Sequence, residues 1–131
     1  MKITVHLLLI IIAKTCVGQQ PTTILEEFKK GNMSYVSKYS SVPFTIKGIS
    51  QDTDTSLLNI SYLSTALLKI LEVIPVSELK NSKIIKSGKT QYLLEFRTFN
   101  EKGELESEST LIFNFKIDNK SYKLTKILLA G

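Results

Sequence analysis

The chain has 131 residues and a formal net charge of +5, with one His, one Cys and no Trp. This length suits one domain with its own hydrophobic core. Its 17 Lys and Arg residues are spread along the sequence, whereas a nucleic-acid binder clusters such residues and interleaves them with aromatic ones. We therefore expect one globular domain that does not bind nucleic acid.

The first eighteen residues have the layout of a secretory signal peptide. Lys2 gives a basic start, residues 3–13 form an almost unbroken apolar run, and Gly18 closes a short group of small residues. The run is about eleven residues long, whereas a membrane-spanning helix needs roughly 20. We therefore expect residues 1–18 to be removed as a signal peptide and residues 19–131 to be exported as a single domain, periplasmic or secreted.

Two alternatives for this segment are less favoured. A retained membrane anchor would place Lys14 badly in the bilayer core. A lipid on Cys16, as in bacterial lipoproteins, requires an aliphatic residue and then a small residue ahead of the Cys, and Lys14-Thr15 departs from that pattern.

Cleavage would remove the only His and the only Cys, His6 and Cys16. The remaining domain would carry 15 Lys and Arg against 12 Asp and Glu, a net charge of +3, because Lys2 and Lys14 leave with the segment. Without His or Cys it can form no Ser-His-Asp triad or thiolate nucleophile, and no zinc site of the usual type. We expect no cofactor and no metal ion.

Two short helices are predicted at the start of the domain. Thr23 and Glu26 have capping-box spacing, so the first helix is expected to begin after Thr23. It is expected to end at Gly31, since glycine tolerates the left-handed backbone that closes a helix. Asn32 can then cap a second helix over residues 33–39.

A long amphipathic helix is predicted in the middle of the chain. Apolar residues recur there at spacings of three and four from Ile60 to Ile74. Pro75 ends the pattern, because the residue before a proline is biased away from helix. A strand over residues 42–48 and a loop over residues 50–56 are expected before this helix.

The second half of the chain has the pattern of strands joined by hairpins. Apolar and polar residues alternate, and turn residues separate the alternating runs at 100–103 and 118–120. Because helices come first and strands follow, the domain is expected to be of the α+β class. The predicted strands are residues 79–86, 91–99, 111–117 and 122–129.

The stretch Ile24–Gly48, ILEEFKKGNMSYVSKYSSVPFTIKG, contains a helix, a Gly31-Asn32 turn, a short helix and a strand. With the long helix and hairpin strands that follow, this order resembles the nuclear transport factor two family over nearly all of residues 22–129. The resemblance implies a cone-shaped, cystatin-like α+β fold, in which a bent antiparallel sheet wraps around N-terminal helices. Small exported bacterial proteins of unknown function share this layout. The family includes enzymes and non-catalytic binding modules, so the fold does not determine the function.

Glu95 and Arg97 are the candidate charged pair of a pocket. Catalytic members of that family place an acid or a His, often with a Tyr, between the sheet and the helices. Glu95 is the only acid in the middle of a predicted strand, and Arg97, two residues on, shares its face. The favoured alternative is a solvated pair on the outer face, because Leu94 and Phe96 on the opposite face have the character of core residues.

Three tyrosines complete the candidate ligand-binding set. Tyr62 on the long helix and two tyrosines on strands could converge on a pocket, although a Tyr is more often a core residue with its hydroxyl at the rim. The alternating Glu104, Glu106 and Glu108 are interpreted as a solvent-facing edge. The full candidate set is Tyr62, Tyr92, Glu95, Arg97 and Tyr122.

The sequence favours an exported, non-catalytic binding or interaction module. Such a module would hold a small apolar ligand between helix and sheet, or form a homodimer through its convex sheet. The alternative is an enzyme of the same fold with Glu95 as general acid or base, which requires Glu95 to face inward. Membrane contact is expected only through an uncleaved or lipidated N-terminus.

Overall fold

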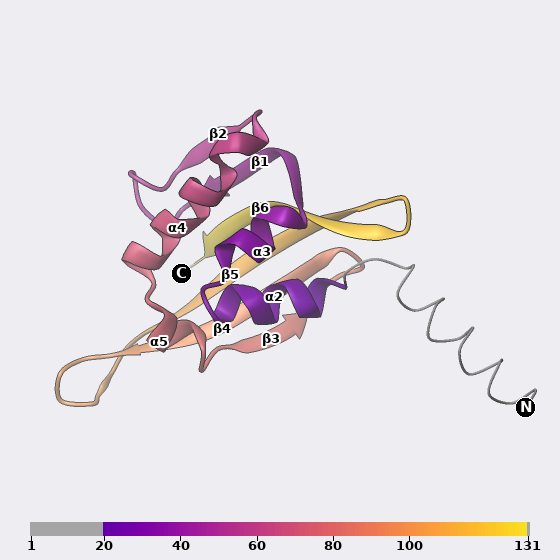
Figure 1. Cartoon of the computed structure of the whole chain (residues 1–131). Helices are drawn as coiled ribbons and strands as arrows, with labels where there is room; N and C mark the ends of the chain where they lie inside the picture. The colour runs from indigo at the N-terminus through magenta and orange to yellow at the C-terminus, as the bar shows by residue number, and fades with distance from the viewer. Residues whose placement is uncertain (1–19, 131) are drawn as a thin grey trace, which may run out of the picture.

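Helices lie on one face of a six-stranded sheet (Figure 1) in the computed structural model, which describes residues 20–130. The predicted signal peptide and Cys16 lie outside the described residues. None of the helices within residues 20–130 is long and apolar enough to cross a membrane. In chain order the elements are α2 (Pro21–Lys29), α3 (Met33–Lys38), β1 (Ser40–Lys47), β2 (Thr55–Leu57), η1 (Ile60–Tyr62), α4 (Leu63–Val73), α5 (Val76–Leu79), β3 (Lys83–Lys86), β4 (Gln91–Phe99), β5 (Leu105–Asp118) and β6 (Ser121–Ala130).

The sheet is mixed rather than purely antiparallel. Its strand order is β2-β1-β6-β5-β4-β3, and β1 runs parallel to β6 while the other neighbours are antiparallel. The hairpins of the second half are confirmed, since each is a local pairing across a short turn. The predicted antiparallel pairing holds for every neighbouring pair except β1–β6. No hairpin joins these two strands, and a parallel pair requires a long connection of the kind that lies between them. The α+β class, with the helices on one face of the sheet, is confirmed.

Helix α2 begins earlier than the capping pattern predicts. Pro21 is its first residue, Gln20 is its N-cap, and no side chain makes a capping hydrogen bond. Proline suits this place because the first helical N–H has no partner within the helix. Thr23 and Glu26 therefore lie inside the helix, and the capping-box prediction is wrong. Asn32 occupies the N-cap position of α3 as predicted, but its side chain makes no capping hydrogen bond either.

Several short elements in the middle of the chain differ from the predictions. Residues 55–57, at the end of the predicted loop, form β2 and pair with β1. Residues 76–79 form helix α5 instead of leading into a strand, and Leu79 is fully buried. The predicted helix over residues 60–74 starts with a 3₁₀ turn and becomes α-helical at Leu63. Such short elements owe their existence to tertiary contacts rather than to local periodicity.

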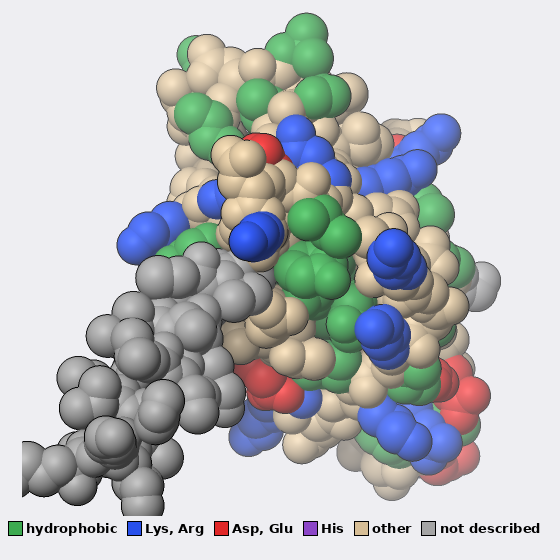
Figure 2. Space-filling model, turned by 90° about the vertical axis from the view of Figure 1, so that its right-hand side faces the viewer, with side chains coloured by type: hydrophobic (Ala, Val, Ile, Leu, Met, Phe, Trp, Pro, Cys, Tyr) green, Lys and Arg blue, Asp and Glu red, His purple; other side chains and the backbone are tan. Residues whose placement is uncertain are grey.

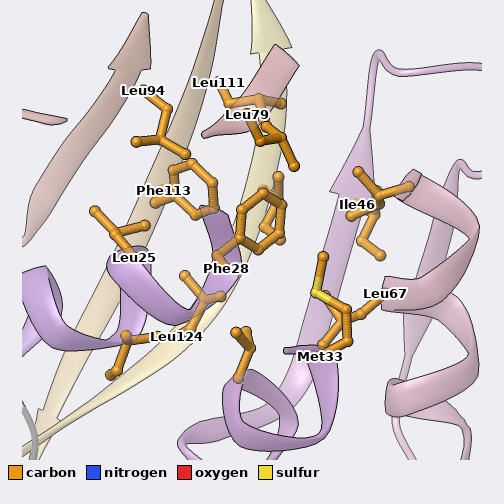
Figure 3. Close-up of a cluster of buried hydrophobic side chains, with 14 of the residues drawn as sticks. Leu25, Phe28, Met33, Ile46, Leu67, Leu79, Leu94, Leu111, Phe113 and Leu124 are labelled. Atoms are coloured by element: carbon orange, nitrogen blue, oxygen red, sulfur yellow. The ribbon is translucent and has the colours of Figure 1, made fainter. Parts of the chain in front are cut away.

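The hydrophobic core fills the space between the helices and the inner face of the sheet (Figure 3). Phe28 of α2 meets Phe113 of β5 edge to face, with ring centroids 5.0 Å apart. Met33 of α3 and Leu67 of α4 pack toward Ile46 of β1. Ten of the buried residues are labelled in Figure 3: Leu25, Phe28, Met33, Ile46, Leu67, Leu79, Leu94, Leu111, Phe113 and Leu124.

Strands β4 and β5 extend beyond the rest of the sheet as a two-stranded ribbon, at the lower left of Figure 1. Strand β3 stops opposite Glu95 and β6 stops opposite Thr110, whereas β4 and β5 stay paired as far as Phe99 and Leu105. The β5–β6 hairpin turns at the other end of β5. Strand β5 therefore links two distant ends of the molecule.

Candidate interaction surface on the outer sheet face

The outer face of the sheet carries a line of apolar side chains. Alternation along the strands turns Leu93 and Ile112 outward, while the residues next to them turn into the core. The strand register sets Ile85 opposite Leu93, Leu93 opposite Ile112, and Ile112 opposite Leu128. All four are half-buried, although the helices lie on the other face (Figure 1). We call these four residues the outer row.

Polar and charged side chains flank the outer row on both sides. On one side, Gln91 Nε2 donates a hydrogen bond to Asn114 Oδ1 at 3.0 Å, and Lys126 lies opposite Asn114. An apolar centre with a polar rim is the usual composition of a protein interface. The other side is a second set of residues in register: Lys83, Glu95, Thr110 and Ala130.

Arg97 and Glu108 form an exposed ion pair next to this second set. Arg97 Nε lies 3.1 Å from Glu108 Oε1, and the two side chains are 68% and 61% exposed. Exposed pairs of this kind contribute only about 0.2–1 kcal/mol to stability. The pair therefore adds little to the stability of the sheet, and both charges stay accessible to solvent.

A depression of about 910 Å³ lies where the ribbon leaves the sheet. Glu95, Arg97 and Glu108 give it charge, and Phe96 and Phe99 give it aromatic surface. Helix α5 and the chain leading into β3 form one of its borders. The residues from that border are Ser77, Glu78, Asn81 and Lys83.

The structure brings Glu95 and Arg97 together but not the three tyrosines. Tyr62 is 65% exposed and borders a separate depression of about 300 Å³ beside α4. Tyr92 is buried in the core, edge to face with Phe115 at 5.8 Å between ring centroids. Tyr122 is half-buried near the β5–β6 hairpin. The hypothesis that these tyrosines converge on one pocket is therefore wrong.

Glu95 lies on the outer face, as the favoured interpretation of the sequence predicts. Its side chain is exposed, while Leu94 and Phe96 on either side point into the core. Acid–base catalysis in a pocket between sheet and helices requires the opposite orientation. Within residues 20–130, no three or more His, Cys, Asp or Glu side chains are grouped so that they could hold a metal ion.

The outer row is the feature that sequence reasoning missed. Its signal is a set of apolar doublets, since strands with a core on one face alone should alternate strictly. In each doublet one residue enters the core and its neighbour joins the outer row. The doublets are Ile84-Ile85, Leu93-Leu94, Leu111-Ile112 and Leu128-Leu129.

The solved structures that this chain is similar to include proteins of the DUF4783 family. The protein from Bacteroides ovatus ATCC 8483 has a TM-score of 0.57 and 13% identity, over 84% of this chain and 93% of that chain. The protein from Bacteroides fragilis YCH46 has a TM-score of 0.56 and 15% identity, over 85% of this chain and 97% of that chain. The protein from Bacteroides uniformis ATCC 8492 has a TM-score of 0.53 and 12% identity, over 86% of this chain and 97% of that chain. At these identities the similarity shows a shared fold alone. No protein-family model and no curated protein matches the sequence.

Proposed function

We propose that this protein is a non-catalytic interaction module that forms a homodimer through the outer face of its sheet. The outer row supports this proposal, because four apolar residues stand in line on the face opposite the helices. A contiguous apolar surface with a polar rim usually marks a contact site on a soluble domain.

The outer row is complementary to itself under a two-fold axis. Such an axis, parallel to the strands and midway between β4 and β5, places β4 of one copy over β5 of the other, and β3 over β6. Leu93 then meets Ile112 of the second copy, and Ile85 meets Leu128. Sheets that pack face to face keep their strand directions within about 30°, so the two rows stay in contact along their length.

The polar rim fits the same arrangement. Arg97 meets Glu108 of the second copy, so the ion pair within each chain becomes a network of four alternating charges. Gln91 meets Asn114, and both side-chain amides can donate and accept hydrogen bonds. The interface is isologous, since each contact occurs twice, as in most soluble homodimers.

Measurement of the oligomeric state over a concentration series tests this proposal. Ile112→Lys places a charge at the centre of the outer row and is expected to give a folded monomer, because Ile112 is only half-buried. Leu68→Lys is the matched control, since Leu68 is 51% exposed on α4, away from the outer row. It is expected to stay dimeric. A wild-type monomer, or a dimer that Ile112→Lys does not dissociate, would refute the proposal.

A second candidate function is ligand binding in the depression at the base of the ribbon. Its volume of about 910 Å³ falls within the roughly 300–1,000 Å³ of small-molecule sites. Glu95 and Arg97 would give this site a preference for a polar ligand. The small apolar ligand expected between helix and sheet has less support, because core side chains fill that space. Native mass spectrometry that finds a retained small molecule, absent from a Glu95→Ala variant, would favour this candidate.

Export remains part of the proposal. The basic start, apolar run and small residues of the first eighteen positions support it. The intact mass of the protein made by its own host is expected to begin near Gln19. A mass that retains Met1, or one with a lipid on Cys16, would instead support anchoring through the N-terminus.

A further inference from the structure

The two ends of strand β5 carry opposite charge. Residues 95–108, which include the ribbon, contain five acidic and two basic residues, whereas residues 116–126 contain four Lys and one Asp. Strand β5 has 14 residues, and at about 3.4 Å per residue it separates the two ends by roughly 44 Å. The domain is therefore an electric dipole with a basic end at the β5–β6 hairpin.

Lysine side chains are held close together at this hairpin end. Lys116 lies directly opposite Lys123 across β5 and β6, and like charges in that arrangement destabilise a sheet. Lys123 Nζ and Lys38 Nζ both approach the ring of Tyr39, at 5.4 and 5.6 Å from its centroid. The ion pairs formed within residues 20–130 include none of these lysines. An anionic partner would relieve the repulsion between them.

Apolar and aromatic side chains stand beside the lysines. Ile117 is 50% exposed and lies opposite Tyr122. Tyr35 and Tyr39 pack together, with ring centroids 4.9 Å apart. Figure 2 shows the side of the molecule on which the hairpin ends, where Lys and Arg side chains surround a strip of hydrophobic ones. Tyr and Lys side chains around an exposed aliphatic residue are typical of protein surfaces at a membrane–water interface.

We propose that the β5–β6 hairpin end docks on an anionic lipid surface. The ammonium groups of Lys116, Lys120 and Lys123 lie among the headgroups, and Ile117 enters the edge of the acyl region. A lipid surface fits better than a soluble anion, because a soluble anion would occupy the lysines and leave Ile117 exposed to water. The charge dipole turns the hairpin toward the membrane and the acidic ribbon away from it.

This docking surface is separate from the outer row and does not depend on dimerisation. Lys116 and Lys120 lie at the end of the sheet, beyond the residues that form the proposed dimer contact. The proposed two-fold axis runs parallel to the strands, so a dimer would present both hairpin ends on the same side. Two copies of the surface would then engage one membrane, which raises the apparent affinity.

Sedimentation with lipid vesicles tests the proposal on the protein as its own host exports it, which is expected to begin near Gln19. Vesicles of phosphatidylcholine mixed with phosphatidylglycerol are expected to bind the protein at low salt, and pure phosphatidylcholine vesicles are not. Each lysine near an anionic surface contributes roughly fivefold to the partition coefficient, so K116Q/K120Q/K123Q should lower it by about 100-fold. The matched control K69Q/K80Q/K102Q has the same net charge and alters exposed lysines elsewhere, so it should bind almost as the wild type does. All variants are produced in the same way and share the same N-terminus, so that the comparison reports the substituted lysines.

An Ile117→Trp variant reports whether the hairpin tip enters the lipid, because the chain has no other Trp. Its fluorescence is expected to shift to the blue with anionic vesicles but not with inorganic phosphate or soluble polyphosphate. Three results would overturn the proposal: equal losses in the two triple variants, equal binding to neutral vesicles, or binding without a blue shift. Binding to polyphosphate as tight as to vesicles would instead identify a soluble acidic polymer as the partner.

Discussion

Gly48, at the end of β1, allows a backbone contact with β6 that a side chain would obstruct. Its φ is +86°, and a Cβ added there would lie 2.7 Å from the carbonyl oxygen of Leu129. That oxygen belongs to the backbone of β6, which runs parallel to β1. A rotamer change cannot relieve the clash. Gly48→Ala therefore requires the two strands to move apart.

Two costs add up in this substitution. A non-glycine residue with a left-handed backbone costs about 1–2 kcal/mol, and overpacking against a structure that cannot relax costs about 1–3 kcal/mol more. Gly48→Ala is therefore expected to lower the free energy of unfolding by about 2–5 kcal/mol. Gly103 provides the control, since its φ is +78° but an added Cβ would meet no atom within 4 Å. Gly103→Ala should bear only the first cost, about 1–2 kcal/mol.

Urea unfolding of the wild type and the two variants, followed by circular dichroism, measures both effects. The slope against urea concentration should be unchanged, so that the midpoints report stability directly. The difference between the variants isolates the clash with β6, because the backbone cost is common to both. Equal losses for Gly48→Ala and Gly103→Ala would refute the close approach of β1 and β6.

Two further predictions concern the core and the tyrosines. Phe28→Ala removes a fully buried ring that packs edge to face on Phe113. It should lower the free energy of unfolding, measured in urea, by about 3–5 kcal/mol. The control is Leu58→Ala, at an 82% exposed position, which should change that free energy by less than about 0.5 kcal/mol. Burial, with a contribution from Tyr39, raises the pKa of Tyr35 above 10.0, so its contribution to stability is complete below that pH and is lost as the pH rises further. The phenolate absorbance titration of the wild type minus that of Tyr35→Phe should give one ionisation with a midpoint above pH 10.0. A midpoint at or below 10.0 would refute the raised pKa of Tyr35.

Much of the local structure follows from short stretches of sequence. Gly31 follows the end of α2 with a φ of +79°, and Pro75 marks the end of α4. The turns at 100–103 and 118–120 join the strands as predicted. These features depend on a few adjacent residues, whose backbone preferences act without help from the rest of the fold. Such local prediction fails where two start signals compete. Pro21 and Thr23 can each mark the start of a helix, and α2 begins at Pro21 rather than after Thr23.

The candidate surface could be predicted only in part. Glu95 faces away from its neighbours Leu94 and Phe96 because side chains alternate along a strand. The placement of Glu95 and Arg97 on the outer face could therefore be inferred from the sequence. The tyrosines could not be placed, because their positions depend on how distant elements pack. Tyr62 and Tyr92 look alike in sequence, yet one is 65% exposed and the other 8%.

The sequence by itself determined the α+β class, the hairpins and the alternation that separates core from surface along each strand. The tertiary structure alone decided the parallel pairing of β1 with β6, the helix α5 and the alignment of the outer row. The physical reason is the separation along the chain of the residues that interact. Turns and alternation are set by neighbouring residues, whereas strand register depends on pairing between distant segments. Ile85 and Leu128 are 43 residues apart, and only the register of four strands places them in one line.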